Sequence, residues 1–181
     1  MAVETAPTKV ITGKVRFSYA HVFEPHAQEE GQTKKYSVAI LIPKKDKATI
    51  AKINAAVEAA TQAGKVKLGG KIPPNLKKPL RDGDEERPDD ENYKGCMFLN
   101  ASSSKKPGIL DPQGNQMLDA SEFYSGCYGL ASINFYAFNT SGNKGIAAGL
   151  NNLKKTEDGE NLGGGGASAE SDFGDDNEEL G

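Results

Sequence analysis

The stretch Ser125–Asn139, SGCYGLASINFYAFN, decides the fold class. Its apolar residues recur at every second position, and they are Cys127, Ala131, Ile133, Phe135 and Ala137. The intervening positions carry the more polar set Tyr128, Ser132, Asn134 and Tyr136. Successive side chains of a strand point to opposite faces, so this alternation predicts a long β-strand with one face in a core.

Further strands are predicted on both sides of this one. Residues 8–19 alternate in the same way, with Ile11, Val15, Phe17 and Tyr19 expected inward and Thr12, Lys14, Arg16 and Ser18 outward. Residues 35–42, 96–102 and 145–153 are also predicted strands, and 107–118 a hairpin that turns at 112–115. About six short strands favour a small antiparallel barrel over a sandwich.

One helix is predicted, over residues 46–63. Asp46 is a suitable N-cap, and Ile50, Ile53, Val57 and Ala60 form an apolar stripe at helical spacing. Gly64 suits a left-handed residue that ends the helix. Residues 65–95 contain four prolines and are expected to form an irregular, charged loop.

The charge of the chain is divided unevenly. Residues 157–181 hold nine acidic residues and no basic one, which leaves 22 basic against 16 acidic residues in 1–156, a net charge of +6. We therefore expect a folded basic domain over 1–156 and a disordered tail over 157–181, with a Gly-rich linker at 163–166. A basic body with an acidic tail indicates a polyanionic partner that the tail can imitate.

Composition excludes several other classes. The longest apolar run, Val38–Ile42, has five residues, whereas a spanning helix needs about 20, so a transmembrane protein is excluded. The first residues lack the pattern of a secretory leader, which makes the cytosol the expected location. Cys96 and Cys127 are too few for a disulfide scaffold and are expected to be reduced.

Enzyme and metal-site interpretations find little support, and we expect neither metal nor cofactor. His21, His26 and the two cysteines match no zinc spacing, which favours loop histidines and buried thiols. Asp82, Asp84 and Glu86 begin like a calcium loop, but Arg87 stands where that loop requires glycine. A nuclease that uses the acidic cluster 82–91 remains an alternative, as does a non-catalytic structural or protein-interaction module.

Basic and aromatic residues together point to single-stranded nucleic acid, because cations follow the phosphates and aromatic rings stack on bases. We expect phosphate contacts from Lys14, Arg16, Lys34, Lys35, Lys105 and Lys106. We expect base contacts from Tyr93, Phe98, Tyr128 and Tyr136.

The tail contains one aromatic residue among its acidic ones. Phe173 lies within ESDFGDD, residues 170–176, and such an aromatic is a suitable short anchor for a basic-rimmed pocket. A disordered tether of about ten residues has an r.m.s. reach of about 16–19 Å, enough to bring the tail to a groove on the body. The expected partner-binding residues are Asp172, Phe173, Asp175, Asp176, Glu178 and Glu179.

Several segments, in order and spacing, resemble a family of tailed-bacteriophage single-stranded DNA-binding proteins. They are LRDGD at 80–84, Tyr93-x-Gly95, Phe98-x-NAS at 98–102, PGILD at 107–111, FYSGCY at 123–128, GIAAGL at 145–150 and DGE at 158–160. The resemblance covers most of residues 10–175.

The resemblance implies an OB-fold, a five-stranded Greek-key barrel, and sequence-independent binding of single-stranded DNA (ssDNA) in phage replication and recombination. It also implies an acidic tail that recruits a phage polymerase or helicase and competes with DNA for the groove. The expected location is then the cytoplasm of the infected bacterium. This chain departs from related tails that end in an aromatic residue, since it ends Glu179-Leu180-Gly181. Two copies could in addition pair through a barrel edge.

Overall fold

The computed structural model describes residues 8–27, 31, 33–140 and 142–162. The strands are β1 (Lys9–Ile11), β2 (Val15–His26), β3 (Lys35–Pro43), β4 (Arg81–Asp82), β5 (Cys96–Ser103), β6 (Gly108–Leu110), β7 (Tyr128–Thr140) and β8 (Asn143–Glu157). The helices are α1 (Lys47–Ala63) and the short α2 (Gly83–Glu86), and η1 (Glu91–Tyr93) and η2 (Ala120–Glu122) are 3-10 turns. Among these residues no helix is both long enough and apolar enough to cross a bilayer.

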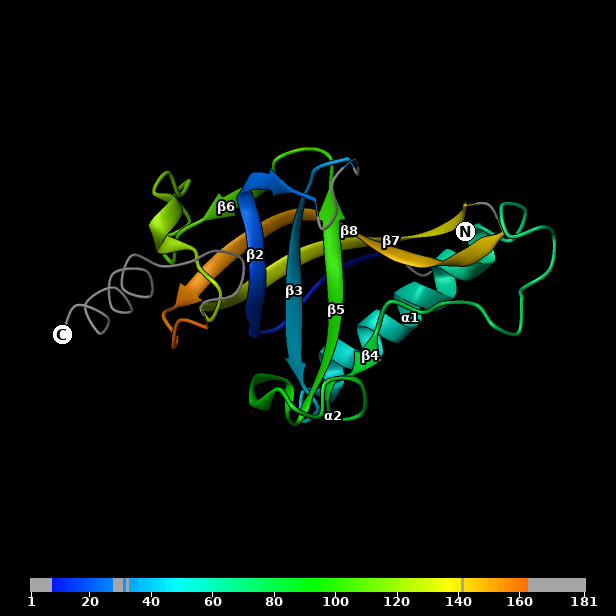
Figure 1. Ribbon diagram of the computed structural model, residues 1–181, viewed down its shortest axis with the longest axis horizontal. Helices are drawn as coiled ribbons and strands as arrows, with labels where there is room; N and C mark the ends of the chain where they lie inside the picture. Colours follow the sequence, from blue (N-terminus) through cyan, green and yellow to red (C-terminus); the bar gives the residue numbers. More distant parts are fainter. Residues whose placement is uncertain (1–7, 28–30, 32, 141, 163–181) are drawn as a thin grey trace, which may run out of the picture.

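Five of the strands close into a barrel (Figure 1). β2 pairs with β3, β3 with β5, and β7 with both β2 and β8, all antiparallel. The parallel pairing of β5 with β8, from Ala101 and Ser102 to Ala148 and Gly149, completes the ring. The mainly β architecture with one main helix, expected as an OB-fold, is confirmed.

The core fills this barrel with alternate residues of each strand. Phe17, Ile40, Leu99, Ile133 and Leu153 come from five different strands, and each is at most 2% exposed. The apolar face predicted from Ser125–Asn139 is buried at every position. Burial of these side chains on folding is the main stabilising contribution to the domain.

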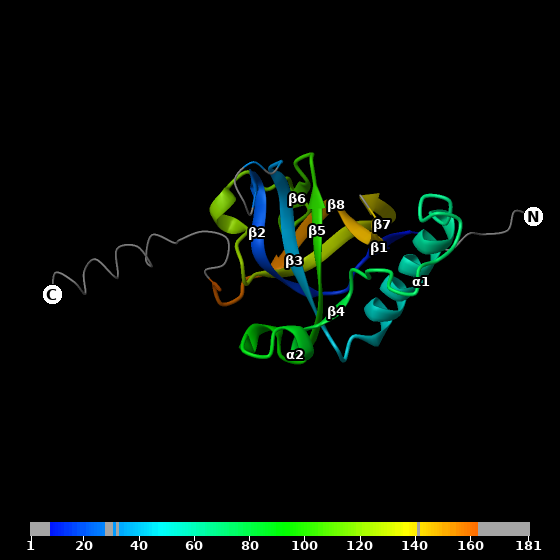
Figure 2. The same cartoon turned by 45° about the vertical axis from the view of Figure 1, so that its right-hand side comes forward.

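Helix α1 lies beside the β7–β8 hairpin (Figure 2). The Asp46 side chain accepts a hydrogen bond from the Thr49 N–H, which confirms the predicted cap. The prediction for Gly64 is wrong in its conformation, because its φ is −98°. Glycine is needed there for space, since an added Cβ would lie 2.3 Å from the Ala137 Cβ.

The predicted first strand is two strands, and the break changes which residues face inward. β1 ends at Ile11 and β2 begins at Val15. Ile11 is therefore exposed, whereas Thr12 is buried and its hydroxyl accepts a hydrogen bond from the Ala131 N–H. The inward assignment is correct for Val15 and Phe17 and wrong for Ile11.

The segment 65–95 is largely irregular, as expected, but it holds β4, α2 and η1 and folds onto the outside of the sheet. There Tyr93 and Phe98 form a small second core with Leu41 on the outer face of the barrel. In the predicted hairpin 107–118 the turn is present, with Gly114 at φ +88°. Only its first arm is a strand, β6, which pairs in parallel with β8.

The folded body continues beyond the boundary expected at residue 156. β8 runs to Glu157, and the next residues pack back on the barrel. The Tyr124 hydroxyl donates to the Asp158 carboxylate, at 2.9 Å, and Arg16 Nη2 donates to the Glu160 carbonyl, also at 2.9 Å. The Leu162 N–H donates to the Ser125 carbonyl, so the described body ends in a fixed position beside β2.

Candidate nucleic-acid interface

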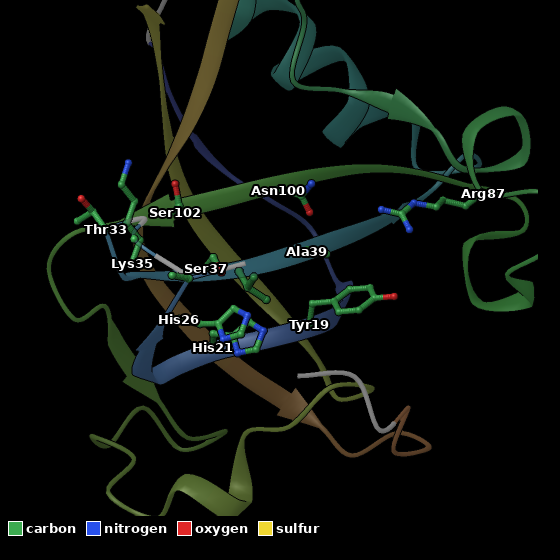
Figure 3. Close-up of a pocket in the computed structure, with 13 residues that line it drawn as sticks. Tyr19, His21, His26, Thr33, Lys35, Ser37, Ala39, Arg87, Asn100 and Ser102 are labelled. Atoms are coloured by element: carbon green, nitrogen blue, oxygen red, sulfur yellow. The ribbon is translucent and has the colours of Figure 1, made fainter. Parts of the chain in front are cut away.

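A groove of about 970 Å³ crosses the outer faces of β2, β3 and β5 (Figure 3). Tyr19 and His21 come from β2, Ser37 and Ala39 from β3, and Asn100 and Ser102 from β5. Gly31 and Thr33, from the β2–β3 connection, also line the groove. In an OB-fold, the second and third barrel strands and the loop before them form the face that binds oligomers, and here those elements are β3, β5 and the β2–β3 connection.

Tyr19 presents its ring in this groove, which contradicts its predicted inward position. It is 43% exposed, and its φ of +47° is the one positive value among the described non-glycine residues. The register of β2 against β3 shifts between Ser18 and His21, so residues after this bulge face the opposite way from those predicted. Backbone in this sparsely populated region is often found at functional sites.

His21 and His26 stack on one another in the same groove. Their ring centroids are 4.0 Å apart, with 6° between the planes (Figure 3). Burial, together with the proximity of His26, lowers the pKa of His21 below its usual value. The prediction of loop histidines is wrong for both, because β2 continues to His26. The signal that could have located them is the apolar pair Val22–Phe23 directly after His21, which indicates that the strand extends beyond Tyr19.

Arg87 closes the groove at the opposite end from Lys35 (Figure 3). Its guanidinium carbon lies 5.5 Å from the ring centre of Tyr93 and 5.8 Å from that of Phe98. The two rings hold a planar cation at the margin of the groove. Sequence reasoning missed Arg87, because it lies within an acidic run in a segment predicted to be irregular.

Tyr93 and Phe98, both predicted base contacts, do not present a ring face in this structure. Each is 1% exposed, and the two rings meet edge to face with centroids 5.0 Å apart. Burial raises the pKa of the Tyr93 hydroxyl, and nearby Arg87 opposes that shift. Both rings belong to the small outer core on which the Arg87 side chain packs.

Four of the predicted phosphate-binding lysines gather near one end of the groove. Lys35 lines it, and Lys34 precedes Lys35 in the chain. Lys105 and Lys106 follow β5, whose Ser103 pairs with Tyr36 at the start of β3. Lys106 Nζ lies 5.2 Å from the ring centre of Phe23, a residue of β2.

A separate cluster consists of Lys14, Arg16 and Tyr128, and in it both cations contact the chain itself. Lys14 is paired with Glu157, and Arg16 donates to the carbonyls of Gly126 and Glu160. Both cations lie over the Tyr128 ring, at 5.0 and 5.3 Å from its centre. The cluster holds the end of the described body against the barrel.

Tyr136 lies on the outer face of β7, opposite Ala147 of β8, and is 43% exposed. It lines no part of the groove on β2, β3 and β5. The predicted partner-binding residues 172–179 lie outside the described residues.

Four residues of the acidic cluster 82–91 contact neighbouring cations or backbone N–H groups. Asp82 and Asp84 both pair with Lys44, whose pKa these hydrogen bonds raise. Glu86 pairs with Arg81, and Asp90 caps η1. Within the part of the chain that the structure describes, no three His, Cys, Asp or Glu side chains are grouped as metal ligands. Cys96 and Cys127 are free thiols, and burial raises the pKa of each.

A closed OB barrel with an aromatic groove and cations at both ends defines a member of the oligomer-binding OB-fold class. Comparison with known proteins makes the assignment specific. Residues 8–180 match the family model described as the Enterobacter phage Enc34 ssDNA-binding protein. The chain belongs to this family of phage ssDNA-binding proteins.

Individual relatives agree with the family assignment. Putative protein p50 of Acyrthosiphon pisum secondary endosymbiont phage 1 is 32% identical over 176 residues, which cover 92% of this chain and 93% of that protein. The ssDNA-binding protein of bacteriophage Enc34, solved in complex with ssDNA, is 28% identical with a TM-score of 0.75, over 86% of this chain and 90% of that one.

A more distant solved structure shares the fold. The ssDNA-binding protein gp2.5 of bacteriophage T7 is 15% identical, with a TM-score of 0.61 over 86% of this chain and 95% of that one. At this identity the similarity concerns the fold alone.

Proposed function

We propose that this protein binds ssDNA without sequence preference along the groove on β2, β3 and β5. The observation that carries the proposal is the placement of Tyr19 and the stacked His21–His26 pair between cations at the two ends of the groove. Membership of the family, and the ssDNA in the complex of the Enc34 relative, support the same ligand.

The groove chemistry suits unpaired strands. Every base has a π-face, so a ring such as Tyr19 stacks on any base, which makes the interaction independent of sequence. Lysines and arginines neutralise phosphates, and this contribution to affinity falls with salt. A duplex hides its base faces within the stack, so the protein would bind the unpaired state in preference and thereby keep strands open.

This activity needs no chemical step, and we propose a non-catalytic role. By coating and protecting ssDNA, the protein would serve phage DNA replication and recombination in the cytoplasm of the infected bacterium. Lys34, Lys35, Lys105 and Lys106 would contact phosphates near one end of the groove, and Arg87 near the other.

The acidic tail is proposed to have two roles. Its six acidic residues in 163–181 would compete with DNA for the basic groove, and Phe173 with its acidic neighbours would recruit a phage polymerase or helicase. The contacts of Asp158, Glu160 and Leu162 place the end of the described body beside β2, the strand that carries Tyr19. DNA binding would then displace the tail and expose it to its partner.

Fluorescence anisotropy with labelled oligo-dT tests the binding proposal. The wild type should bind oligo-dT more tightly than the matching duplex, with affinity that falls as salt rises. Tyr19→Ala should weaken binding by about 1–3 kcal/mol, which is about 5- to 150-fold, whereas Tyr19→Phe keeps the ring and should be nearly neutral. Equal affinity for single strand and duplex would instead favour an interaction module, and an unaffected Tyr19→Ala variant would place the site elsewhere.

A truncation after Leu162 tests the tail. Because residues 158–162 contact the barrel, this cut removes the acidic segment and leaves those contacts in place. The truncated protein should bind oligo-dT more tightly at low salt, and the gain should shrink as salt screens both interactions. Phe173→Ala should reduce capture of the phage polymerase or helicase while it changes DNA affinity little. Equal affinity of the full and truncated chains at low salt would rule out competition.

Pairing of two copies through a barrel edge stays a prediction. The sheet ends in β1 and β6, which are the strands available for such pairing. Light scattering across a concentration series would measure the mass directly.

A further inference from the structure

A second groove, of about 570 Å³, lies where β5 and β8 separate. The two strands pair at Ala101–Ala148 and Ser102–Gly149. The segment Lys77–Arg81 spans the opening from one strand to the other, because Lys77 bridges to Gly145 of β8 and Arg81 pairs with Phe98 of β5. The groove therefore has β5 on one side, the β7–β8 hairpin on the other, and this segment across it.

The second groove is continuous with the first. Asn100 and Ser102, on the outer face of β5, line both. Ala101, which lies between Asn100 and Ser102 in β5, is buried on the inner face. On β5, therefore, no bulky side chain separates the two grooves. A ligand that crosses β2 and β3 along the first groove can continue over β5 into the second.

The second groove carries the charge that a phosphate backbone requires. Lys77, Lys78 and Arg81 line it. Arg81 pairs with Glu86, whereas neither lysine forms an ion pair with any described residue. The β7–β8 hairpin contributes Phe138, Ile146, Ala147 and Ala148 to the lining.

An exposed ring lies beside the part of this groove that β8 lines. Tyr136 is the cross-strand partner of Ala147, and its Cε1 would be 3.5 Å from a Cβ added to Gly149. Directly opposed residues of an antiparallel pair share one face of the sheet, so the Tyr136 ring and the groove lining at Ala147 lie on the same surface. Cations that line a groove and an exposed ring beside it are the combination that binds single strands.

We propose that the second groove is an extension of the ssDNA site, in which Lys77 and Lys78 bind phosphates and Tyr136 stacks on a base. This inference rests on the proposed function of the first groove. It predicts that short oligonucleotides occupy the first groove alone and that longer oligonucleotides occupy both grooves.

Affinities for an oligo-dT series of about 4 to 16 nucleotides, the range of site sizes for one OB-fold, test the proposal. Lys77→Gln/Lys78→Gln should leave affinity for the shortest bound member unchanged and weaken the longest. For the longest oligonucleotide, the slope of log affinity against log salt should be shallower by about 1.4 in this variant than in the wild type. Each phosphate that is no longer neutralised changes this slope by about 0.7, and two are lost. Tyr136→Ala should likewise weaken only the longer members, by about fivefold or more.

The matched control is Lys65→Gln/Lys71→Gln, which removes the same charge from the same irregular segment at positions that line neither groove. Tyr19→Ala, in contrast, should weaken every length. Lysine acetylation provides a readout on the unmodified chain: the longest oligo-dT should protect Lys77 and Lys78, the shortest should not, and Lys65 should react equally throughout.

The outcomes separate the two proposals. If the wild type binds no oligo-dT, the proposed function fails. If it binds but the Lys77→Gln/Lys78→Gln variant shows the wild-type length and salt dependence, only the extension is refuted. Tighter binding by this variant would also refute it, because the lysines would then hold the acidic tail rather than DNA.

Discussion

Replacement of Arg87 separates the charge of this residue from its shape. The guanidinium lies over the rings of Tyr93 and Phe98 and lines the first groove. Arg87→Gln removes both the charge and the cation–π interactions. Arg87→Lys keeps the charge but removes the planar group that lies against two rings.

The structure sets the size of both effects. Two cation–π interactions at an exposed residue contribute about 1 kcal/mol together, so each variant should lower the melting temperature by about 2–4 °C. If the variant neutralises one phosphate fewer than the wild type, the slope of log affinity against log salt becomes shallower by about 0.7. This difference corresponds to binding that is about eightfold weaker at 50 mM salt and about threefold weaker at 200 mM. This second effect is expected for Arg87→Gln alone.

The assay is oligo-dT anisotropy at four or more salt concentrations, with thermal unfolding of the same samples. Lys52→Gln is the charge control, because Lys52 is exposed on α1 and lines neither groove. Equal salt slopes for Arg87→Gln and the wild type would refute the phosphate interaction. An unchanged melting temperature in both Arg87 variants would refute the support by the two rings.

Three further predictions concern stability and pH. Phe98→Ala should lower the free energy of unfolding, measured by urea titration, by about 3–5 kcal/mol. Phe98→Leu should keep the ssDNA affinity of the wild type. A large loss of affinity in folded Phe98→Leu would show that the Phe98 ring contacts a base. Gly64→Ala should destabilise by about 1–3 kcal/mol through its clash with Ala137, against less than about 0.5 for the exposed Ala63→Ser. Because the pKa of His21 is lowered in the folded protein, this side chain binds more protons in the unfolded chain than in the folded one. Its contribution to stability is therefore complete above about pH 6.5 and is lost as the pH falls below that value. Phosphates favour the charged ring, so ssDNA affinity should rise from pH 7.5 to 5.5 more in the wild type than in His21→Gln; parallel pH profiles would exclude His21 from the site.

Local pattern alone was sufficient for much of the fold. The inward residues of β7 were all correct, because a long strand with one buried face repeats every two residues wherever it lies in the chain. The helix start at Asp46 was also correct, since a capping carboxylate acts on backbone N–H groups three residues away. The identity of the family followed from the order and spacing of short motifs.

The candidate site depended on long-range structure. Tyr19 faces the groove because a bulge in β2, set by its pairing with β3, reverses the alternation after Ser18. Tyr93 and Phe98 look like exposed aromatics in the sequence, but the segment 81–95 folds over the sheet and buries both rings. That same packing brings Arg87 to the groove.

The sequence by itself therefore determined the barrel strands, the helix, the uneven charge and the class of ligand, because each rests on periodicity, composition or interactions within a few residues. Only the tertiary structure decided which aromatic rings are available and which cations share a groove. Those properties depend on pairings between segments far apart in the chain, such as β2 with β3 and β5 with β8. A one-residue shift in any such pairing moves a side chain to the other face, and no local pattern records it.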